Sequence, residues 1–296
     1  MALGENFCKL WQDSSFRSKV QAIVVDEAHC IVEWGDKFRK EYSGLAKLQD
    51  YIGQEIPILA CTATCSSKTF EVIWSSLAFG FRPFWGLDVG VDRKNLSFIV
   101  HVLENTANPV LDALNILPAP IPEDINIPNT VLPKSLFYFE TINQCNSAME
   151  TLRKILPAHY RDSVQMFTSI ASEDAKAQIW DNFRTGSIRI LCATDAAGMG
   201  CNVPDVAFVV LFSVPRSIST LTQRWGRAGR SRDIEATCIL FVQGWAFRPQ
   251  GVHLKTKKGK EKPLESATFT ANRAKIDPPL EKLINLGHDE KLPSGE

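Results

Sequence analysis

The sequence predicts an α/β protein with parallel sheets, on three observations. Short apolar runs rich in β-branched residues recur along the chain, which is typical of strands buried on both faces of a parallel sheet. Segments with helical spacing of apolar residues lie between these runs. Five prolines in residues 116–133 interrupt the pattern and divide the runs into two groups. We therefore expect two lobes joined by a proline-rich linker.

The expected elements follow the chain in alternating order. Strands are predicted at 21–26, 58–62, 98–103, 136–139, 188–192 and 206–211. Helices are predicted at 68–79, 143–156 and 172–184. The third helix has a capped start, because Ser172 is followed by Glu173 and Asp174.

Composition limits the kind of protein. Lys plus Arg and Asp plus Glu both number 33, so the whole chain has no bulk positive field and nucleic-acid affinity must come from a local surface. The eight cysteines are scattered without metal-ligand spacing, which predicts a reduced compartment and no zinc site. No signal-peptide pattern and no apolar stretch of membrane-spanning length occurs, so we expect a soluble protein that is not secreted.

Two carboxylates follow the first predicted strand, in the sequence Asp26-Glu27-Ala28-His29. They are expected at the carboxyl edge of a sheet, where ligands bind in open α/β folds. There Asp26 can hold a magnesium ion and Glu27 can activate a water. A charged turn that caps the next helix explains these four residues about as well.

A second cluster of polar residues, Gln223-Arg224-Trp225-Gly226-Arg227-Ala228-Gly229-Arg230, lies in the second lobe, and Cys61-Thr62-Ala63-Thr64 follows the second predicted strand. We expect Arg227 and Arg230 to share one face of a helical turn, with glycines that allow close approach of neighbouring backbone. Both arginines would then point together at a polyphosphate.

Taken together, these motifs resemble superfamily 2 helicases. Residues 26–42, DEAHCIVEWGDKFRKEY, resemble the Walker B motif of the RecQ family running into its aromatic-rich loop. Further similarity falls in family order at 92–96, 136–139, 193–200 and 204–206, and the resemblance covers about residues 20–243.

The resemblance implies roles for individual residues. Asp26 would hold Mg²⁺, Glu27 would be the general base for attack of water on the γ-phosphate, and Arg227 and Arg230 would stabilise the transferring phosphoryl group. The residues implied in ATP binding or its coupling to DNA are His29, Thr62, Thr64, Asp195, Gly198, Gly200 and Gln223.

DNA contacts are implied for Trp34, Phe38 and Arg39, whose aromatic and guanidinium planes can stack on unpaired bases. Without the resemblance, Trp34 and Phe38 would be interpreted as core anchors. The chain departs from the family pattern at Glu33, Asp36, Lys37, Ala197 and Asn202.

By this resemblance we expect two RecA-like parallel-sheet lobes, the first incomplete and the second complete. The predicted divisions are a partial first lobe at 1–104, a linker at 105–134, a second lobe at 135–245 and a polar, flexible tail at 246–296. The implied activity is ATP-dependent 3′ to 5′ unwinding of DNA, with ATP and Mg²⁺ as cofactors and single-stranded or forked DNA as partner. A nuclear location and a part in DNA repair and recombination are implied in the same way.

The phosphate-binding loop of such motors, GxxxxGK[ST], does not occur in the 296 residues. The pair Gly259-Lys260 is followed by Glu261 in a basic run, and only 25 residues precede Asp26. We therefore expect a first lobe with uncovered apolar surface, to which a partner can bind, and negligible ATP hydrolysis by this chain alone. Two alternatives stay open: a non-catalytic nucleic-acid-binding or interaction module, and an RNA helicase of the DEAH group, which the RecQ-like loop disfavours.

Overall fold

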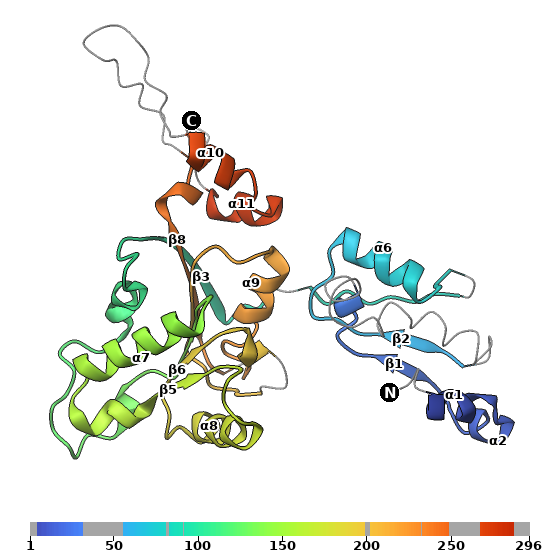
Figure 1. Ribbon diagram of the computed structural model, residues 1–296, viewed down its shortest axis with the longest axis horizontal. Helices are drawn as coiled ribbons and strands as arrows, with labels where there is room; N and C mark the ends of the chain where they lie inside the picture. Colours follow the sequence, from blue (N-terminus) through green and yellow to red (C-terminus); the bar gives the residue numbers. More distant parts are fainter. Residues whose placement is uncertain are drawn as a thin grey trace, which may run out of the picture. The chain divides into compact units, whose positions relative to one another are not determined.

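The computed structural model describes residues 5–31, 56–80, 83–90, 92–198, 202–231, 233–248 and 267–286. The chain forms two compact units, Met1–Asp92 and Arg93–Glu296 (Figure 1). In the described ranges, no helix combines the length and the apolar character needed to cross a membrane.

The first unit contains a two-stranded parallel sheet, β1 (Ile23–Val25) and β2 (Ile58–Ala60), which confirms the strands predicted there. Its helices are α1 (Glu5–Gln12), α2 (Ser14–Arg17) and α6 (Ser67–Ser76). One side of the sheet packs on α6 through a small core that includes Val25, Ile73 and Leu77. Val24 and Leu59, which pair in register, are 60% and 52% exposed. The two strands therefore carry an apolar pair that the described structure leaves open to solvent.

The second unit is built on six parallel strands in the order β3-β8-β7-β4-β6-β5 (Figure 1). The strands are β3 (Leu96–Leu103), β4 (Ser135–Tyr138), β5 (Val164–Phe167), β6 (Ile190–Ala193), β7 (Phe208–Phe212) and β8 (Ala236–Gln243). Its α-helices are α7 (Ile142–Ile155), α8 (Glu173–Thr185), α9 (Ile218–Trp225), α10 (Ala267–Arg273) and α11 (Pro278–Ile284). Short 3-10 helices are η1 (Pro109–Ile116), η2 (Asn129–Val131), η3 (Ala158–Ser163), η4 (Asp195–Gly198) and η5 (Gly244–Ala246).

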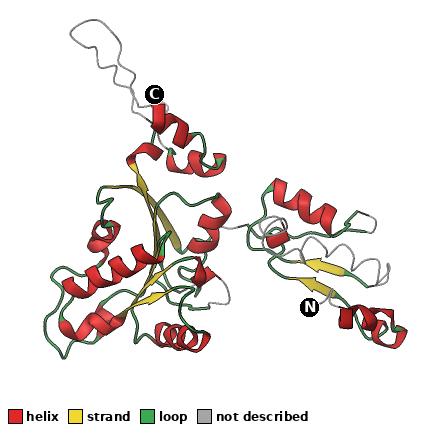
Figure 2. Cartoon of the chain, in the orientation of Figure 1, coloured by secondary structure: helices red, strands yellow, loops and turns green. Residues whose placement is uncertain are grey.

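Strands β4, β6, β7 and β8 are buried on both faces, and Figure 2 shows helices on either side of the strands. Successive side chains of β4 alternate between two cores, because side chains of a strand point to opposite faces. Leu136 and Tyr138 pack with α8, α9 and α11, whereas Phe137 packs with α7, η1 and η3. The burial expected from the apolar runs is thus confirmed for β4, β6 and β7, whereas β3 is largely exposed.

Local sequence signals set the ends of two helices. Ser172 caps α8 by accepting a hydrogen bond from the Ala175 N–H, and Gly186 ends the helix in the left-handed region at φ 93°. Thr141 and Gln144 form a reciprocal capping box at the start of α7. The helices expected at 143–156 and 172–184 are therefore confirmed to within about a residue.

The boundary between the units differs from the one expected at residue 104. Strand β3 pairs along its whole length with β8, from Leu96 opposite Ala236 to Leu103 opposite Gln243, and so belongs to the second unit. An apolar run predicts a strand but not which strand it pairs with, so the sequence pattern placed β3 in the wrong lobe. Strands β5 and β8 were not predicted at all.

The proline-rich segment 105–134 is not the simple linker that was expected. Val110 and Ala113 of η1 and Leu132 after η2 are buried in the core against α7. Pro109 occupies the first turn of η1, where its missing N–H costs nothing. The prolines exclude long regular helices, but the apolar residues between them still bury against the sheet.

The tail predicted as flexible contains α10 and α11, and α11 buries Leu280 and Ile284 in the core of the second unit. The Arg248 guanidinium pairs with the Glu281 carboxylate at 2.8 Å, and Asn285 accepts a hydrogen bond from the Arg248 N–H at 2.7 Å. High overall polarity concealed the i, i+4 apolar pair that docks this helix.

Candidate functional site

The two acidic residues after β1 lie in a constrained turn. Glu27 has φ 49°, and its N–H donates to Oδ1 of Asp26 at 2.9 Å. The Ala28 N–H then donates to the Cys61 carbonyl at 2.9 Å, which ties the turn to the end of β2. A left-handed conformation at a residue other than glycine costs on the order of 1 kcal/mol and is characteristic of functional sites. Asp26 is exposed and Glu27 is half-buried. Of the two residues, Glu27 is the one with a left-handed backbone conformation.

His29 links Glu27 to the second motif of the first unit. Its Nδ1 lies 3.0 Å from Oγ1 of Thr62 and 3.3 Å from Oε2 of Glu27, and its side chain is buried. The Thr62 hydroxyl donates its one proton to the Thr64 carbonyl at 2.9 Å. Thr62 must then accept from His29, so we assign the proton of the neutral ring to Nδ1. His29, Thr62 and Thr64 thus form one hydrogen-bonded series, and the Glu27 carboxylate lies beside its first member.

The arginine motif of the second unit differs from the expected helical turn. Helix α9 ends at Trp225, and residues 226–230 continue as a turn and loop. Gly229 has φ 44°, a conformation that other residues rarely adopt, so the helix does not extend through the motif. Arg227 is buried, and Arg230 donates from Nη1 to Oδ1 of Asn202 at 3.0 Å. Arg227 and Arg230 were expected to share one face of a helical turn. They lie instead on a turn and loop that follow the end of α9.

Sequence reasoning did not single out Arg224, which organises the neighbouring site residues. Its guanidinium is buried, donates to Oδ1 of Asp195 at 2.6 and 3.2 Å, and lies 3.4 Å from Oε1 of Glu140. It also stacks over the Tyr138 ring at 5.1 Å. The signal was present in its spacing, because Arg224 lies three residues after the buried Leu221 on the same helix. Asp195, expected in nucleotide coupling, is here the ion-pair partner of Arg224.

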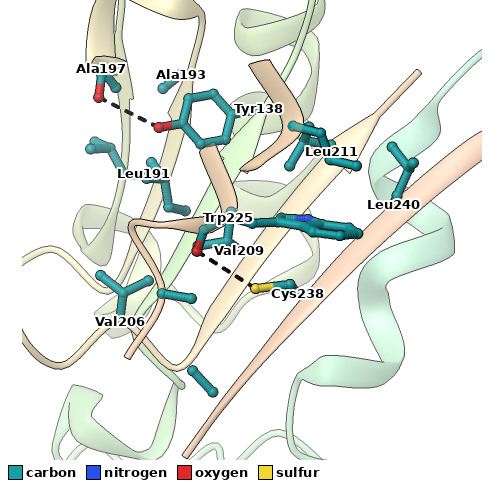
Figure 3. Close-up of a cluster of buried hydrophobic side chains, with 14 of the residues drawn as sticks. Tyr138, Leu191, Ala193, Ala197, Val206, Val209, Leu211, Trp225, Cys238 and Leu240 are labelled. Carbon is teal, nitrogen blue, oxygen red and sulfur yellow. Dashed lines mark hydrogen bonds between the residues drawn. The ribbon is translucent and has the colours of Figure 1, made fainter. Parts of the chain in front are cut away.

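A cluster of buried hydrophobic side chains contains residues of α9 and of the segment after β6, among them Trp225 and Ala197 (Figure 3). The Tyr138 hydroxyl donates to the Ala197 carbonyl at 3.5 Å, and the Cys238 thiol donates to the Trp225 carbonyl at 3.7 Å. The Trp225 indole packs in the same apolar core as Leu211 and lies 5.0 Å from the Phe98 ring. The cluster thus anchors the end of α9 and the segment after β6.

The buried thiols of the second unit have raised pKa values. Burial raises the pKa of Cys145 and of Cys238 to about 12, and it raises the pKa of Cys192 further. These side chains therefore remain neutral near pH 7 and act as small apolar groups.

The structure describes some of the remaining residues that were expected at the site. Gln223 is half-buried on α9, and Gly198 ends η4. Gly200, Trp34, Phe38 and Arg39 lie outside the described residues.

The chain is similar to known proteins over most of its length. Residues 127–232 match the family model of the helicase conserved C-terminal domain. ATP-dependent DNA helicase Q-like 4B of Arabidopsis thaliana is 29% identical over 241 residues, which cover 81% of this chain and 19% of that protein. Putative ATP-dependent DNA helicase Q1 of Caenorhabditis briggsae is 31% identical over 235 residues, covering 76% and 34%. The chain thus spans 19% and 34% of the lengths of these two relatives.

Solved structures support the fold. Mss116p bound to single-stranded RNA and AMP-PNP has a TM-score of 0.58 at 17% identity, over 80% of this chain and 47% of that one. The Mycobacterium smegmatis helicase Lhr, bound to single-stranded DNA and AMP-PNP, has a TM-score of 0.56 at 18% identity, over 80% and 30%. These likenesses show a RecA-like fold. The chain therefore contains a helicase conserved C-terminal domain and is related over most of its length to RecQ-like ATP-dependent DNA helicases.

Proposed function

We propose that this chain is part of an ATP-driven motor that separates DNA strands with 3′ to 5′ polarity. The observation that carries the proposal is a series of contacts that starts at Glu27, whose Oε2 lies 3.3 Å from Nδ1 of His29. His29 is hydrogen-bonded to Thr62, and the Thr62 hydroxyl donates to the Thr64 carbonyl. A motor must transmit the state of a hydrolysed nucleotide to its nucleic-acid contacts. This series is a physical route by which a change at the Glu27 carboxylate reaches the end of β2.

Asp26 fits a magnesium ligand of the kind that phosphoryl-transfer enzymes use. Mg²⁺ in such sites is held by one or two carboxylates together with substrate phosphates and water, and Asp26 presents an exposed carboxylate. The ion would neutralise phosphate charge. Glu27 would accept the proton of the attacking water, and its carboxylate lies 3.3 Å from Nδ1 of His29.

The second unit would supply cationic groups to the phosphates. Arginine binds phosphate through several N–H donors in fixed geometry, which suits Arg227 and Arg230 for stabilising the transferring group. Asp195 would act through its ion pair with Arg224, so that the segment 195–198 and α9 move as one body. Gln223, Gly198 and Gly200 would complete the nucleotide contacts, and Trp34, Phe38 and Arg39 would stack on unpaired DNA bases.

Turnover by this motor would require a phosphate-binding loop that these 296 residues do not contain. Such a loop positions the phosphates with backbone N–H groups, and positioning supplies much of the rate enhancement in phosphoryl transfer. We also propose that the apolar pair Val24 and Leu59 is covered in the working motor, since parallel sheets are normally buried on both faces. We further propose that the motor acts in the nucleus, in DNA repair or recombination, by analogy with RecQ-like relatives.

The test is reconstitution. The chain is combined with a polypeptide that carries the phosphate-binding loop of a RecQ-like relative, and DNA-stimulated ATP hydrolysis and unwinding of a forked duplex are measured. Activity that disappears with Glu27→Gln supports the proposal. DNA binding with no hydrolysis in any combination would instead identify a non-catalytic nucleic-acid-binding module, the second candidate, which the missing loop favours.

A further inference from the structure

Two side chains from the start of the second unit hold the loop that carries the arginine motif. The amide nitrogen of Asn95 lies 2.7 Å from the Ile234 carbonyl, 2.8 Å from that of Gly229 and 3.3 Å from that of Ser231. The Arg93 guanidinium donates to the carbonyls of Ala228 and Gly229. Both residues lie about 135 positions before the loop in sequence, and both precede the stretch that matches the helicase domain.

These bonds satisfy carbonyls that have no strand or helix partner. An asparagine amide has two N–H donors, so the two short bonds to Gly229 and Ile234 use both, and the Ser231 oxygen shares one of them. On the other side, the Gly229 N–H donates to the Val206 carbonyl at 2.8 Å. The loop backbone is thus fixed from two directions, through its carbonyls and through its N–H groups.

Gly229 shows how closely Asn95 approaches the loop. A Cβ atom at this position would lie 2.9 Å from Nδ2 of Asn95 and 2.9 Å from the Ile234 oxygen. Contacts below 3.0 Å require something to shift, and the positive φ of Gly229 adds strain for any other residue. The glycine between Arg227 and Arg230 is therefore needed to admit the Asn95 side chain.

We propose that Asn95 and Arg93 are positioning residues for Arg227 and Arg230. They act through the backbone carbonyls of the described loop residues that they contact, which are Ala228, Gly229, Ser231 and Ile234. The inference rests on the proposed function only for what the arginines bind. A loop anchored at its carbonyls presents its side chains in one arrangement, which lowers the entropy lost when they engage phosphate oxygens. Burial lowers the pKa of the Arg93 guanidinium, consistent with a side chain packed into the protein.

The first experiment measures the loop itself in the full 296-residue chain by hydrogen–deuterium exchange with mass spectrometry. Asn95→Ala and the isosteric Asn95→Asp, which removes both donors, are compared with Asn108→Ala. Asn108 also donates one side-chain hydrogen bond in this unit, to the Thr151 hydroxyl at 2.9 Å, but it does not contact the loop. We expect exchange in the peptide spanning 226–234 to rise about tenfold or more in both Asn95 variants and not in the control.

Unchanged exchange in that peptide in folded Asn95→Asp overturns the proposal. So does an equal rise in Asn108→Ala, because that would reflect a general loss of stability. If Asn95→Ala fails to fold, Asn95→Asp and Arg93→Lys supply the comparison. Arg93→Lys keeps the charge but loses the forked donors, and should raise exchange selectively at residues 228–229.

The second experiment measures binding of inorganic triphosphate to the same variants. We expect Asn95→Asp to weaken affinity several-fold, in the same direction as Arg230→Ala, with Asn95→Gln closer to the original chain than Asn95→Asp. Triphosphate binding that is indifferent to Arg230→Ala, together with a selective rise in exchange, would leave the anchoring role intact and refute the phosphate role of the arginines. The two failures are thereby distinguishable.

Discussion

The carboxylate of Asp277 accepts a hydrogen bond of 2.7 Å from the backbone N–H of Ile218, the first residue of α9. Asp277 is itself the N-cap residue of α11, yet it makes no side-chain cap bond to its own helix. The first N–H groups of a helix have no partner within the helix, and a negative charge there is favourable. The C-terminal helices therefore stabilise the helix that leads into the arginine motif.

We expect Asp277→Ala to lower the free energy of unfolding of the second unit by about 1 to 2 kcal/mol. Asp277→Asn should lose less, because its amide oxygen still accepts the bond. Urea denaturation followed by tryptophan fluorescence measures both, with the exposed Asp162→Ala as control. Equal stability of Asp277→Ala and the control would contradict the cap.

Thr62→Val should destabilise the first unit, because it leaves the buried His29 N–H without its threonine acceptor and frees the Thr64 carbonyl. An unsatisfied buried donor costs about 1 to 3 kcal/mol. The matched control is Thr69→Val, which loses an exposed hydrogen bond to Ser66. Thermal unfolding measures the stability lost in both variants. A smaller loss in Thr62→Val than in Thr69→Val would contradict the hydrogen bonds from His29 to Thr62 and from Thr62 to Thr64.

The 296-residue chain alone should hydrolyse ATP negligibly, and Glu27→Gln should make no difference above background. The reason is the missing phosphate-binding loop, without which Glu27 and Arg230 have no fixed phosphates to act on. Supplying that loop should produce DNA-stimulated turnover that requires both residues. Robust hydrolysis by the purified chain, abolished by Glu27→Gln, would show that another segment binds the phosphates.

Single-stranded DNA should bind with modest affinity that falls steeply with salt, because the chain has zero formal net charge and relies on local cationic groups. Replacing Trp34 and Arg39 together by alanine should weaken binding several-fold, given about 1 to 3 kcal/mol per stacked base. Fluorescence anisotropy at several salt concentrations measures this. An unchanged affinity in the double variant would refute the stacking role of the loop.

Stability of the second unit should decline at alkaline pH. Burial raises the pKa of Cys145 from 9.0 to about 12, so the folded state favours the neutral thiol. This contribution is fully present below pH 9 and is lost as pH rises from about 9 toward 12, where the unfolded chain ionises first. Urea unfolding at pH 7, 9 and 10 should show the loss, and Cys145→Ala should have a shallower dependence. Identical slopes would exclude this thiol as a source.

Several features were determined by local sequence. The caps at Ser172 and Thr141 bond within their own helices, and the apolar runs predict strands because each must bury both faces. The motif around Asp26 was recognisable for the same reason, since its residues are neighbours in the chain. The RecA-like architecture and the relationship to RecQ-like helicases could therefore be predicted from the sequence.

Tertiary structure alone decided which strand β3 pairs with, which ion pair engages Asp195, and what holds the arginine loop. Each depends on residues far apart in sequence: β3 pairs with β8, Arg224 with Asp195, and Asn95 with the Gly229 carbonyl. Hydrophobic periodicity predicts that a residue is buried, but it carries no information on its partner. A polar side chain such as Asn95 or Asp277 has no periodic signal at all, because its role is set by backbone groups that only folding brings within hydrogen-bonding distance.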